Sequence, residues 1–241
     1  MPLNGKTILV TGGARRVGRR LALAAARAGA NVIIHHANSP LEADETAAEI
    51  ERLGCQAWVL QADFRDPSQA EGLVERASTL SSLYAIIHNA AIFEPLELTN
   101  TSLEDWQRHF NINLTAPFLL SRDFARLHTP GTEGRLLTIL DWRAFRPVAD
   151  HFPYTISKAA LAAMTRSLAA ALAPEITVNG LALGAILPPS DGSDTEWVRR
   201  EVPAGRWADA EEVEQAALFL LDGPRYITGE VIHLDGGRHL L

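Results

Sequence analysis

The chain contains 241 residues, of which 47% are hydrophobic and 21% are charged. These proportions are typical of a folded globular protein and argue against a disordered one, and the length fits a single α/β domain. The formal charge of -7 argues against binding to nucleic acid or to an anionic membrane surface, because both need a basic patch. We therefore expect a small-molecule partner.

The N-terminus leads directly into a strand-like run and lacks the basic and apolar regions of a signal peptide. No apolar run reaches the roughly 18 residues of a membrane span. The single cysteine, Cys55, lies in an apolar run and cannot form an internal disulfide, which favours a buried, inert thiol over a reactive one. We expect a cytoplasmic protein without a membrane segment.

Seven apolar, strand-like runs alternate with segments of helical spacing, and they cover residues 7–10, 31–35, 57–60, 85–88, 136–140, 177–181 and 231–234. Six helices separate them; Gly29 and Gly54 mark two helix ends, and Asp209 with Glu212 forms a capping-box pattern. This alternation predicts a parallel sheet with helices on both faces, and the continuously apolar strands agree. The predicted fold is a doubly wound Rossmann-type α/β domain over residues 1–241.

A glycine-rich turn follows the first strand and leads into a helix expected over residues 19–28. Glycines allow a tight turn and a close approach to a pyrophosphate, whose charge the amides at the helix N-terminus then meet. Many strand-to-helix turns contain two glycines, so the position of the turn supports this interpretation more than its composition does. The residues expected to bind a dinucleotide here are Gly12, Arg15, Arg16, Val17 and Gly18.

The end of the second strand carries no carboxylate, the group that binds the ribose diol of NADH and repels a 2'-phosphate. It offers the neutral donors His36, Asn38 and Ser39, and Arg15 or Arg16 can add positive charge. We therefore expect NADPH rather than NADH. Asn38 and Ser39 also fit a simple turn before the next helix, and both interpretations can hold.

Tyr154 and Lys158 are four residues apart, so on a helix they share a face. A nearby cation favours a phenolate, and we expect Lys158 to depress the pKa of Tyr154 and make it a proton donor near neutral pH. The spacing alone is common in helices. With the glycine turn, it resembles the short-chain dehydrogenase/reductase family, whose Tyr-x-x-x-Lys motif it matches.

Further motifs extend the resemblance over nearly the whole chain. Asn89 and Ala90 resemble the family's Asn-Asn-Ala-Gly segment beside the cofactor, and Asp63 matches the residue that lies against the adenine. Asp63 would look the same as a plain helix cap. Asn113 matches the asparagine that holds a helix open around a water in the proton relay; the alternative is a helix-surface amide.

After the sixth strand the family usually has Pro-Gly and then a hydroxyl residue, whereas this chain has Leu183, Gly184 and later Ile186. The resemblance implies cofactor contacts from Gly184 and from the backbone of Ile186. The segment 186–206 is rich in proline and glycine, and it is either a substrate loop over the site or a tolerated surface insertion.

Asp141 stands thirteen residues before Tyr154, where most family members have a serine. An ionised carboxylate only accepts hydrogen bonds and opposes the negative charge that develops on a ketone oxygen. It suits a substrate rich in N–H donors, such as a pterin, or proton transfer to a ring nitrogen. Pteridine reductases carry an aspartate here, and they also have an Arg-x-Gly turn like Arg16 to Gly18 and an aromatic residue like Phe93.

The resemblance therefore implies an NADPH-dependent reductase that transfers hydride to a C=N bond of a pterin or dihydropterin. Tyr154 would donate the proton, Lys158 would tune it and hold the nicotinamide ribose, and Asn113 would hold the relay water. Asp141, Phe93 and Arg16 would position the pterin. The C-terminal residues 236–240 are especially similar to bacterial dihydromonapterin reductases, and the family usually forms homotetramers.

Two alternatives stay open: a reductase or dehydrogenase of another carbonyl metabolite, with Asp141 protonated or turned away, and a cofactor-binding regulator without catalysis. The presence of Tyr154 and Lys158 argues against the regulator.

The eight histidines are scattered, so we expect no metal site. Trp142 and Trp197 are candidate pocket walls, but packing is the more common role of a tryptophan, and neither is assigned to the site.

Overall fold

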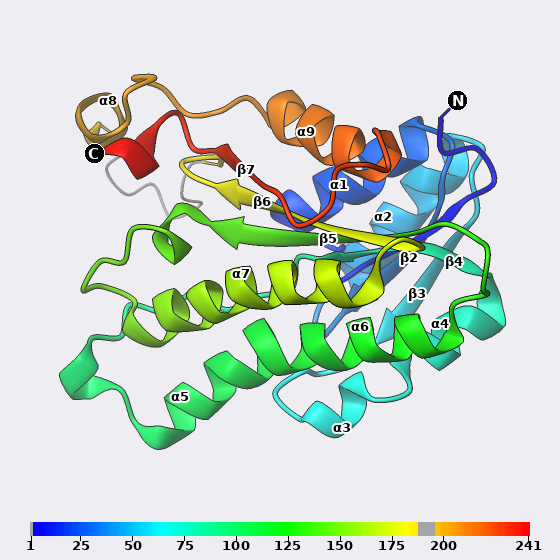
Figure 1. Cartoon of the computed structure of the whole chain (residues 1–241), viewed down its shortest axis with the longest axis horizontal. Coiled ribbons are helices and arrows are strands. Elements are labelled where there is room, and N and C mark those ends of the chain that lie inside the picture. The colour runs from blue at the N-terminus through cyan, green and yellow to red at the C-terminus, as the bar shows by residue number, and fades with distance from the viewer. Residues whose placement is uncertain (1, 188–195) are drawn as a thin grey trace.

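The computed structural model describes residues 2–187 and 196–241 and contains one seven-stranded sheet (Figure 1). Every neighbouring pair of strands is parallel, and the strand order is β3-β2-β1-β4-β5-β6-β7. The strands are β1 (Thr7–Val10), β2 (Asn31–His36), β3 (Ala57–Gln61), β4 (Leu83–His88), β5 (Gly134–Asp141), β6 (Ile176–Leu183) and β7 (Val231–Leu234). All seven predicted strands and the single doubly wound domain are confirmed.

Nine α-helices occur in the described residues, more than the six predicted. They are α1 (Arg16–Arg27), α2 (Pro40–Arg52), α3 (Pro67–Ala70), α4 (Leu73–Leu80), α5 (Leu103–Phe110), α6 (Ala116–Leu127), α7 (Phe152–Leu172), α8 (Trp197–Glu201) and α9 (Ala210–Asp222). The excess arises because some connections between strands are broken into two helices, as α3 and α4 are between β3 and β4. α1 also begins three residues earlier than expected.

Helices cover both faces of the sheet: α1, α2 and α9 lie on one face, and α4, α6 and α7 on the other (Figure 1). Successive strand residues point into the two layers in turn. Ile8 and Val10 of β1 join the core beneath α1, whereas Leu9 between them joins the core beneath α4 and α6. Because both sides of a strand are buried, no position needs to be polar, which explains the continuous apolar runs.

The predicted helix ends are confirmed. Gly29 and Gly54 follow α1 and α2 with φ of +95° and +86°, the left-handed conformation that glycine adopts at low cost. The side chains of Asp209 and Glu212 form the capping box of α9.

Cys55 is half-buried rather than buried, and burial raises the pKa of its thiol, which keeps it protonated.

The strand order changes direction at β1, whose neighbours are β2 and β4. Loops that leave β1 and β4 therefore diverge to opposite faces, and a crevice opens at the carboxyl ends of these strands. Within the described residues, no helix is both long and apolar enough to cross a bilayer.

Candidate active site

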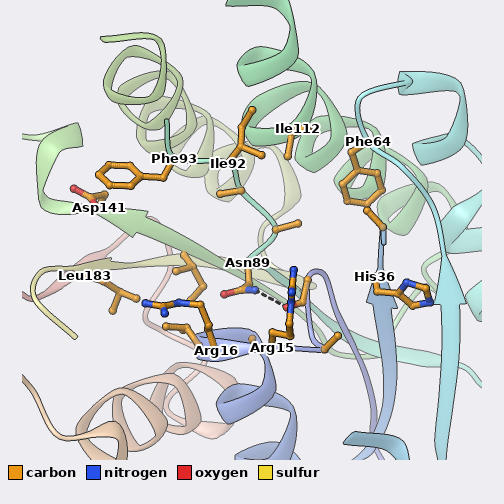
Figure 2. Close-up of a pocket in the computed structure, with 18 of the residues that line it drawn as sticks. Arg15, Arg16, His36, Phe64, Asn89, Ile92, Phe93, Ile112, Asp141 and Leu183 are labelled. Carbon is orange, nitrogen blue, oxygen red and sulfur yellow. Dashed lines mark hydrogen bonds between the residues drawn. The ribbon is translucent and has the colours of Figure 1, made fainter. Parts of the chain in front are cut away.

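A cavity of about 630 Å³ lies at the carboxyl ends of the strands (Figure 2). Of the predicted site residues, those that line it are Gly12, Arg15, Arg16, Val17, Gly18, His36, Asn38, Ser39, Asp63, Asn89, Ala90, Phe93, Asp141, Tyr154, Lys158, Gly184 and Ile186. Asn113 is the predicted residue that does not line it. The fold thus brings together side chains from widely separated parts of the sequence.

The glycine turn packs against Asn89 too closely for larger residues. Gly12 has φ of +63°, and a Cβ on Gly18 would overlap the carbonyl oxygen of Gly12 and lie 2.5 Å from Asn89 Nδ2. Asn89 Nδ2 donates hydrogen bonds to the oxygens of Thr11 (2.9 Å) and Gly12 (3.2 Å). Thr11 Oγ1 in turn accepts the backbone N–H groups of Asn89 and Ala90. The two loops are therefore fixed to each other.

His35 supports the same turn, although sequence reasoning did not assign it a role. Its Nδ1 accepts the N–H of Gly12 (3.1 Å), and its Nε2 lies 2.9 Å from the oxygen of Ala62, so Nε2 carries the hydrogen. Its ring stacks on Phe64, another lining residue, at 4.2 Å. Burial lowers the pKa of His35 to about 4 and keeps it neutral. A histidine in an otherwise apolar strand beside the turn was the available signal.

The end of the cavity near β2 contains His36, Asn38 and Ser39. His36 is buried, and its Nδ1 accepts the N–H of Ser39 at 3.3 Å. Arg15 is exposed and lies 3.5 Å from Glu42, a contact that contributes little to stability. Arg16 is also exposed, has φ of +50°, and has no ion-pair partner among the residues that the structure describes. Both guanidinium groups are available to an anion.

Asp63 lines the cavity but is not a helix cap, so that interpretation is wrong. Its carboxylate accepts hydrogen bonds from the guanidinium and the backbone N–H of Arg65, which hold the pKa of Asp63 below its ordinary value. Asp66 caps α3 instead, by accepting the N–H of Ser68 at 3.0 Å.

Tyr154 and Lys158 lie on the first turns of α7, as predicted, and are buried. The hydroxyl of Tyr154 donates to Asp141 Oδ2 at 3.1 Å. Lys158 Nζ donates to the main-chain oxygen of Ile139 at 2.8 Å and lies 5.7 Å from the centre of the Tyr154 ring. The tyrosine, lysine and aspartate therefore form one cluster at the end of β5.

The expected depression of the tyrosine pKa is wrong for this structure. Burial raises the pKa of Tyr154 well above its ordinary value, and the neighbouring Asp141 raises it further. Lys158 does not counteract this, because its ammonium binds a main-chain oxygen and burial lowers its own pKa to about 8. Burial also raises the pKa of Asp141, against the lowering effect of Arg143. Tyr154 thus keeps its proton near neutral pH in this structure.

Asn113 lies in a π-helical segment (Asn111–Thr115) between α5 and α6, and it is completely buried. Its Oδ1 accepts the N–H of Ile92 at 3.0 Å, and its Nδ2 donates to the oxygen of Ile92 and to Ser157 Oγ. The interpretation as a helix-surface amide is wrong. A π-helical turn is wider than an α-helical turn, and such turns are frequent at functional sites.

Phe93 is 51% exposed and lines the cavity from the opposite side to the glycine turn (Figure 2). Its ring stacks on His151 at 3.8 Å and an interplanar angle of 5°, and it contacts the Tyr154 ring edge-on at 4.7 Å. His151 was missed by sequence reasoning.

Trp207 lines the cavity, whereas Trp142 and Trp197 each lie 4.4 Å from the guanidinium of Arg238 and do not line it.

Beyond β6, a Cβ on Gly184 would lie 2.6 Å from the Cα of Asp235, so the packing of the C-terminal segment requires glycine there. Ile186 lines the cavity and packs in the core beneath α1. The expected substrate loop 186–206 includes residues 188–195, which lie outside the described residues. Its later part contains α8, and Val198 of α8 and Val202 at its C-cap pack against Ala185.

The part of the chain that the structure describes contains no group of three or more His, Cys, Asp or Glu side chains placed to hold a metal ion. Tyr154, Lys158 and Asp141 line the cavity and give it a phenol, an amine and a carboxyl group, and Gly12 and Gly18 of the glycine turn line it as well.

Comparison with known proteins extends over nearly the whole chain. A family model described as enoyl-(acyl carrier protein) reductase matches residues 12–239. The 3-oxoacyl-acyl-carrier-protein reductase of Synechocystis sp. is 30% identical over 240 residues, covering 98% of this chain and 97% of that protein.

Two solved structures are similar in fold and sequence. The FolM alternative dihydrofolate reductase 1 of Brucella canis, complexed with NADP, superposes with a TM-score of 0.92 at 34% identity and covers 100% of this chain and 97% of its own. A short-chain dehydrogenase of Burkholderia cenocepacia in complex with NADP has a TM-score of 0.92 at 34% identity and covers 99% of each chain.

Proposed function

Because the chain belongs to the short-chain dehydrogenase/reductase family and is an NADPH-dependent reductase, we propose that its substrate is a pterin or dihydropterin, reduced at a C=N bond. The observation that carries this proposal is the hydrogen bond from Tyr154 to Asp141 at 3.1 Å. A carboxyl group stands beside the proton donor, at the position where most family members carry a serine.

The cavity fits NADPH, which supplies the hydride when bound. Gly12 and Gly18 let the turn pack tightly on Asn89 beside the N-terminus of α1, whose amides would stabilise a pyrophosphate. The neutral donors His36, Asn38 and Ser39, with the cations Arg15 and Arg16, suit the 2'-phosphate. Asp63, Asn89, Ala90, Val17, Gly184 and Ile186 line the rest of the proposed cofactor site.

Tyr154 is the proposed proton donor, since its hydroxyl is protonated and lies in the cavity. Lys158 holds a positive charge beneath it and is proposed to hold the nicotinamide ribose. Asn113 keeps the π-helical segment in place through Ile92 and Ser157, and it is proposed to hold a relay water.

Asp141 is proposed to accept N–H groups of the pterin or to pass a proton to a ring nitrogen. Phe93 exposes ring surface to the same cavity and suits stacking of a flat heteroaromatic. Arg16, exposed and unpaired among the described residues, is proposed to reach the pterin and the cofactor phosphates. The similarity to a Brucella protein named as an alternative dihydrofolate reductase supports this choice of substrate.

The test follows the loss of NADPH absorbance with dihydrobiopterin, dihydromonapterin and dihydrofolate, compared with a panel of small ketones. We expect turnover of at least one pterin. Asp141→Ser should lower kcat/KM for that pterin by about 10- to 150-fold, the effect of losing a hydrogen bond to a charged group of about 1.5–3 kcal/mol. Asp44→Ser, at an exposed position on α2, is the matched control. Turnover of ketones alone would contradict the proposal.

A second candidate is reduction of the carbonyl group of another small metabolite. It is favoured by the raised pKa of Asp141, since a protonated carboxyl could donate a hydrogen bond to a carbonyl oxygen. The relative from Synechocystis is named for the reduction of a 3-oxoacyl group on acyl carrier protein, which is also a carbonyl substrate. The ketone arm of the same assay distinguishes the two. The homotetramer that the resemblance implies, and the cytoplasmic location expected from the composition of the chain, are proposals.

A further inference from the structure

Arg143 contacts the carboxyl group of Asp141 from the short 3-10 turn (Trp142–Ala144) that follows β5. Its backbone N–H donates to Asp141 Oδ1 at 2.8 Å, and its Nη1 lies 3.8 Å from the same oxygen. Tyr154 binds the other oxygen, Oδ2. Asp141 is therefore held on both carboxyl oxygens, by a cation on one side and by the proton donor on the other.

The guanidinium of Arg143 is itself fixed by its surroundings, and its side chain is only 15% exposed. Nη2 donates to Asp150 Oδ2 at 3.2 Å. The guanidinium lies 4.8 Å from the Trp142 ring and 5.3 Å from the Phe93 ring, within the range of cation–π contacts. Such a group cannot swing away from Asp141 without losing several contacts at once.

The contacts of Arg143 and Asp141 belong to a closed ring of neighbouring side chains. Asp150 Oδ2 also lies 3.1 Å from Nδ1 of His151, whose ring stacks on Phe93. Phe93 contacts the ring of Tyr154 edge-on, and Tyr154 returns to Asp141. Neither Arg143 nor His151 is among the described residues that line the cavity. Both act from behind the residues proposed to touch the substrate.

We propose that Arg143 is a positioning residue, which orients the carboxyl group of Asp141 beside Tyr154 and sets its charge, and that Asp150 anchors Arg143. The proposal rests on the proposed function, in which Asp141 binds the pterin. Arg143 acts through Asp141 and is not itself a catalytic residue.

The titratable and charged groups around Asp141 come from three segments. Arg143 and Asp150 flank it on the loop after β5, Tyr154 and Lys158 face it from α7, and Arg238 near the C-terminus also acts on it. Burial raises the pKa of Asp141, and the backbone N–H of Arg143 lowers it most; the guanidinium charge of Arg143 comes next and exceeds the effect of Lys158. Removal of an opposite charge at this distance shifts a carboxyl pKa by about 1–3 units.

The experiment compares Arg143→Met, Arg143→Lys and the control Arg146→Met, whose side chain is exposed on the same loop. Protonation of Asp141 is followed by the infrared band of the neutral carboxyl group, assigned as the band that disappears in Asp141→Asn. We expect the titration midpoint to rise by at least about 1 pH unit in Arg143→Met. It should be largely restored in Arg143→Lys and unchanged in Arg146→Met.

The second readout is the pH profile of kcat/KM for the dihydropterin, in which the limb set by Asp141 should move upward in Arg143→Met by the same amount. A midpoint that does not move in folded Arg143→Met overturns the role of Arg143, whatever the substrate is. Failure of the wild-type protein to reduce any pterin refutes the proposed function instead, and the infrared titration then still decides the role of Arg143.

Discussion

Replacement of Gly18 by alanine tests whether the glycine turn is shaped for the cofactor. Gly18 lies within α1, where helix propensity alone favours alanine by about 0.8–1 kcal/mol. Its Cβ, however, would overlap the oxygen of Gly12 and lie 2.5 Å from Asn89 Nδ2. Neither group yields freely, because Asn89 is hydrogen-bonded to Thr11 and Gly12. We expect the turn to move away from Asn89.

The cost of such overpacking is about 1–3 kcal/mol. If NADPH binds only when the turn returns to its wild-type position, that free energy must be supplied on binding. The affinity for NADPH then falls by roughly 5- to 150-fold. The assay is a titration of NADPH fluorescence, with urea unfolding measured in parallel. We expect a higher Kd in Gly18→Ala even under conditions in which the variant is fully folded.

Gly54→Ala is the matched control. Gly54 has φ of +86°, and no atom lies within 4 Å of a Cβ placed there, so the variant should lose about 1–2 kcal/mol of stability from backbone strain alone. Its affinity for NADPH should not change. Wild-type affinity in Gly18→Ala, or equal weakening in both variants, would refute the reasoning from the packing of the turn.

The remaining predictions concern the cluster on α7. Tyr154→Phe should lower kcat by at least about 100-fold, as expected for loss of a general acid, with the Kd for NADPH in a fluorescence titration nearly unchanged; a large loss of NADPH binding would count against its role as proton donor. Lys158 has a pKa of about 8 in the folded protein, below its ordinary value of 10.5, so between these pH values the unfolded chain binds the proton that the folded chain has released. The stability of the wild type relative to Lys158→Met should therefore rise by up to about 3 kcal/mol from pH 8 to pH 10.5, and a pH-independent difference in urea unfolding would contradict this.

The fold was predictable because its signals lie close together along the chain. A buried parallel strand needs only a short apolar run, and the turn between β1 and α1 needs only a few consecutive residues around Gly12 and Gly18. The helices were less predictable. Short breaks such as that between α3 and α4, and the π-helical segment around Asn113, depend on how a helix packs on its neighbours.

Much of the candidate site was also predictable, since Tyr154 and Lys158 match a family motif and Asp141 stands at a position that the motif defines, thirteen residues before Tyr154. The supporting residues were not. His35 holds the turn through Gly12, 23 residues away, and His151 stacks on Phe93 from a loop far along the chain. The contact of His151 leaves no pattern in the sequence, and the signal for His35, a histidine in an otherwise apolar strand, does not specify a role because histidine has many.

By itself, the sequence determined the order of strands and helices, the place of the glycine turn and the residue types at the carboxyl ends of the strands. Only the tertiary structure decided how those residues titrate and which of them meet. A pKa depends on burial and on charges brought near by the fold, so Lys158 was expected to depress the pKa of Tyr154, whereas desolvation and the carboxyl group of Asp141 raise it. The physical reason is that desolvation and pairing are properties of distances in space, which the spacing of residues along the chain does not contain.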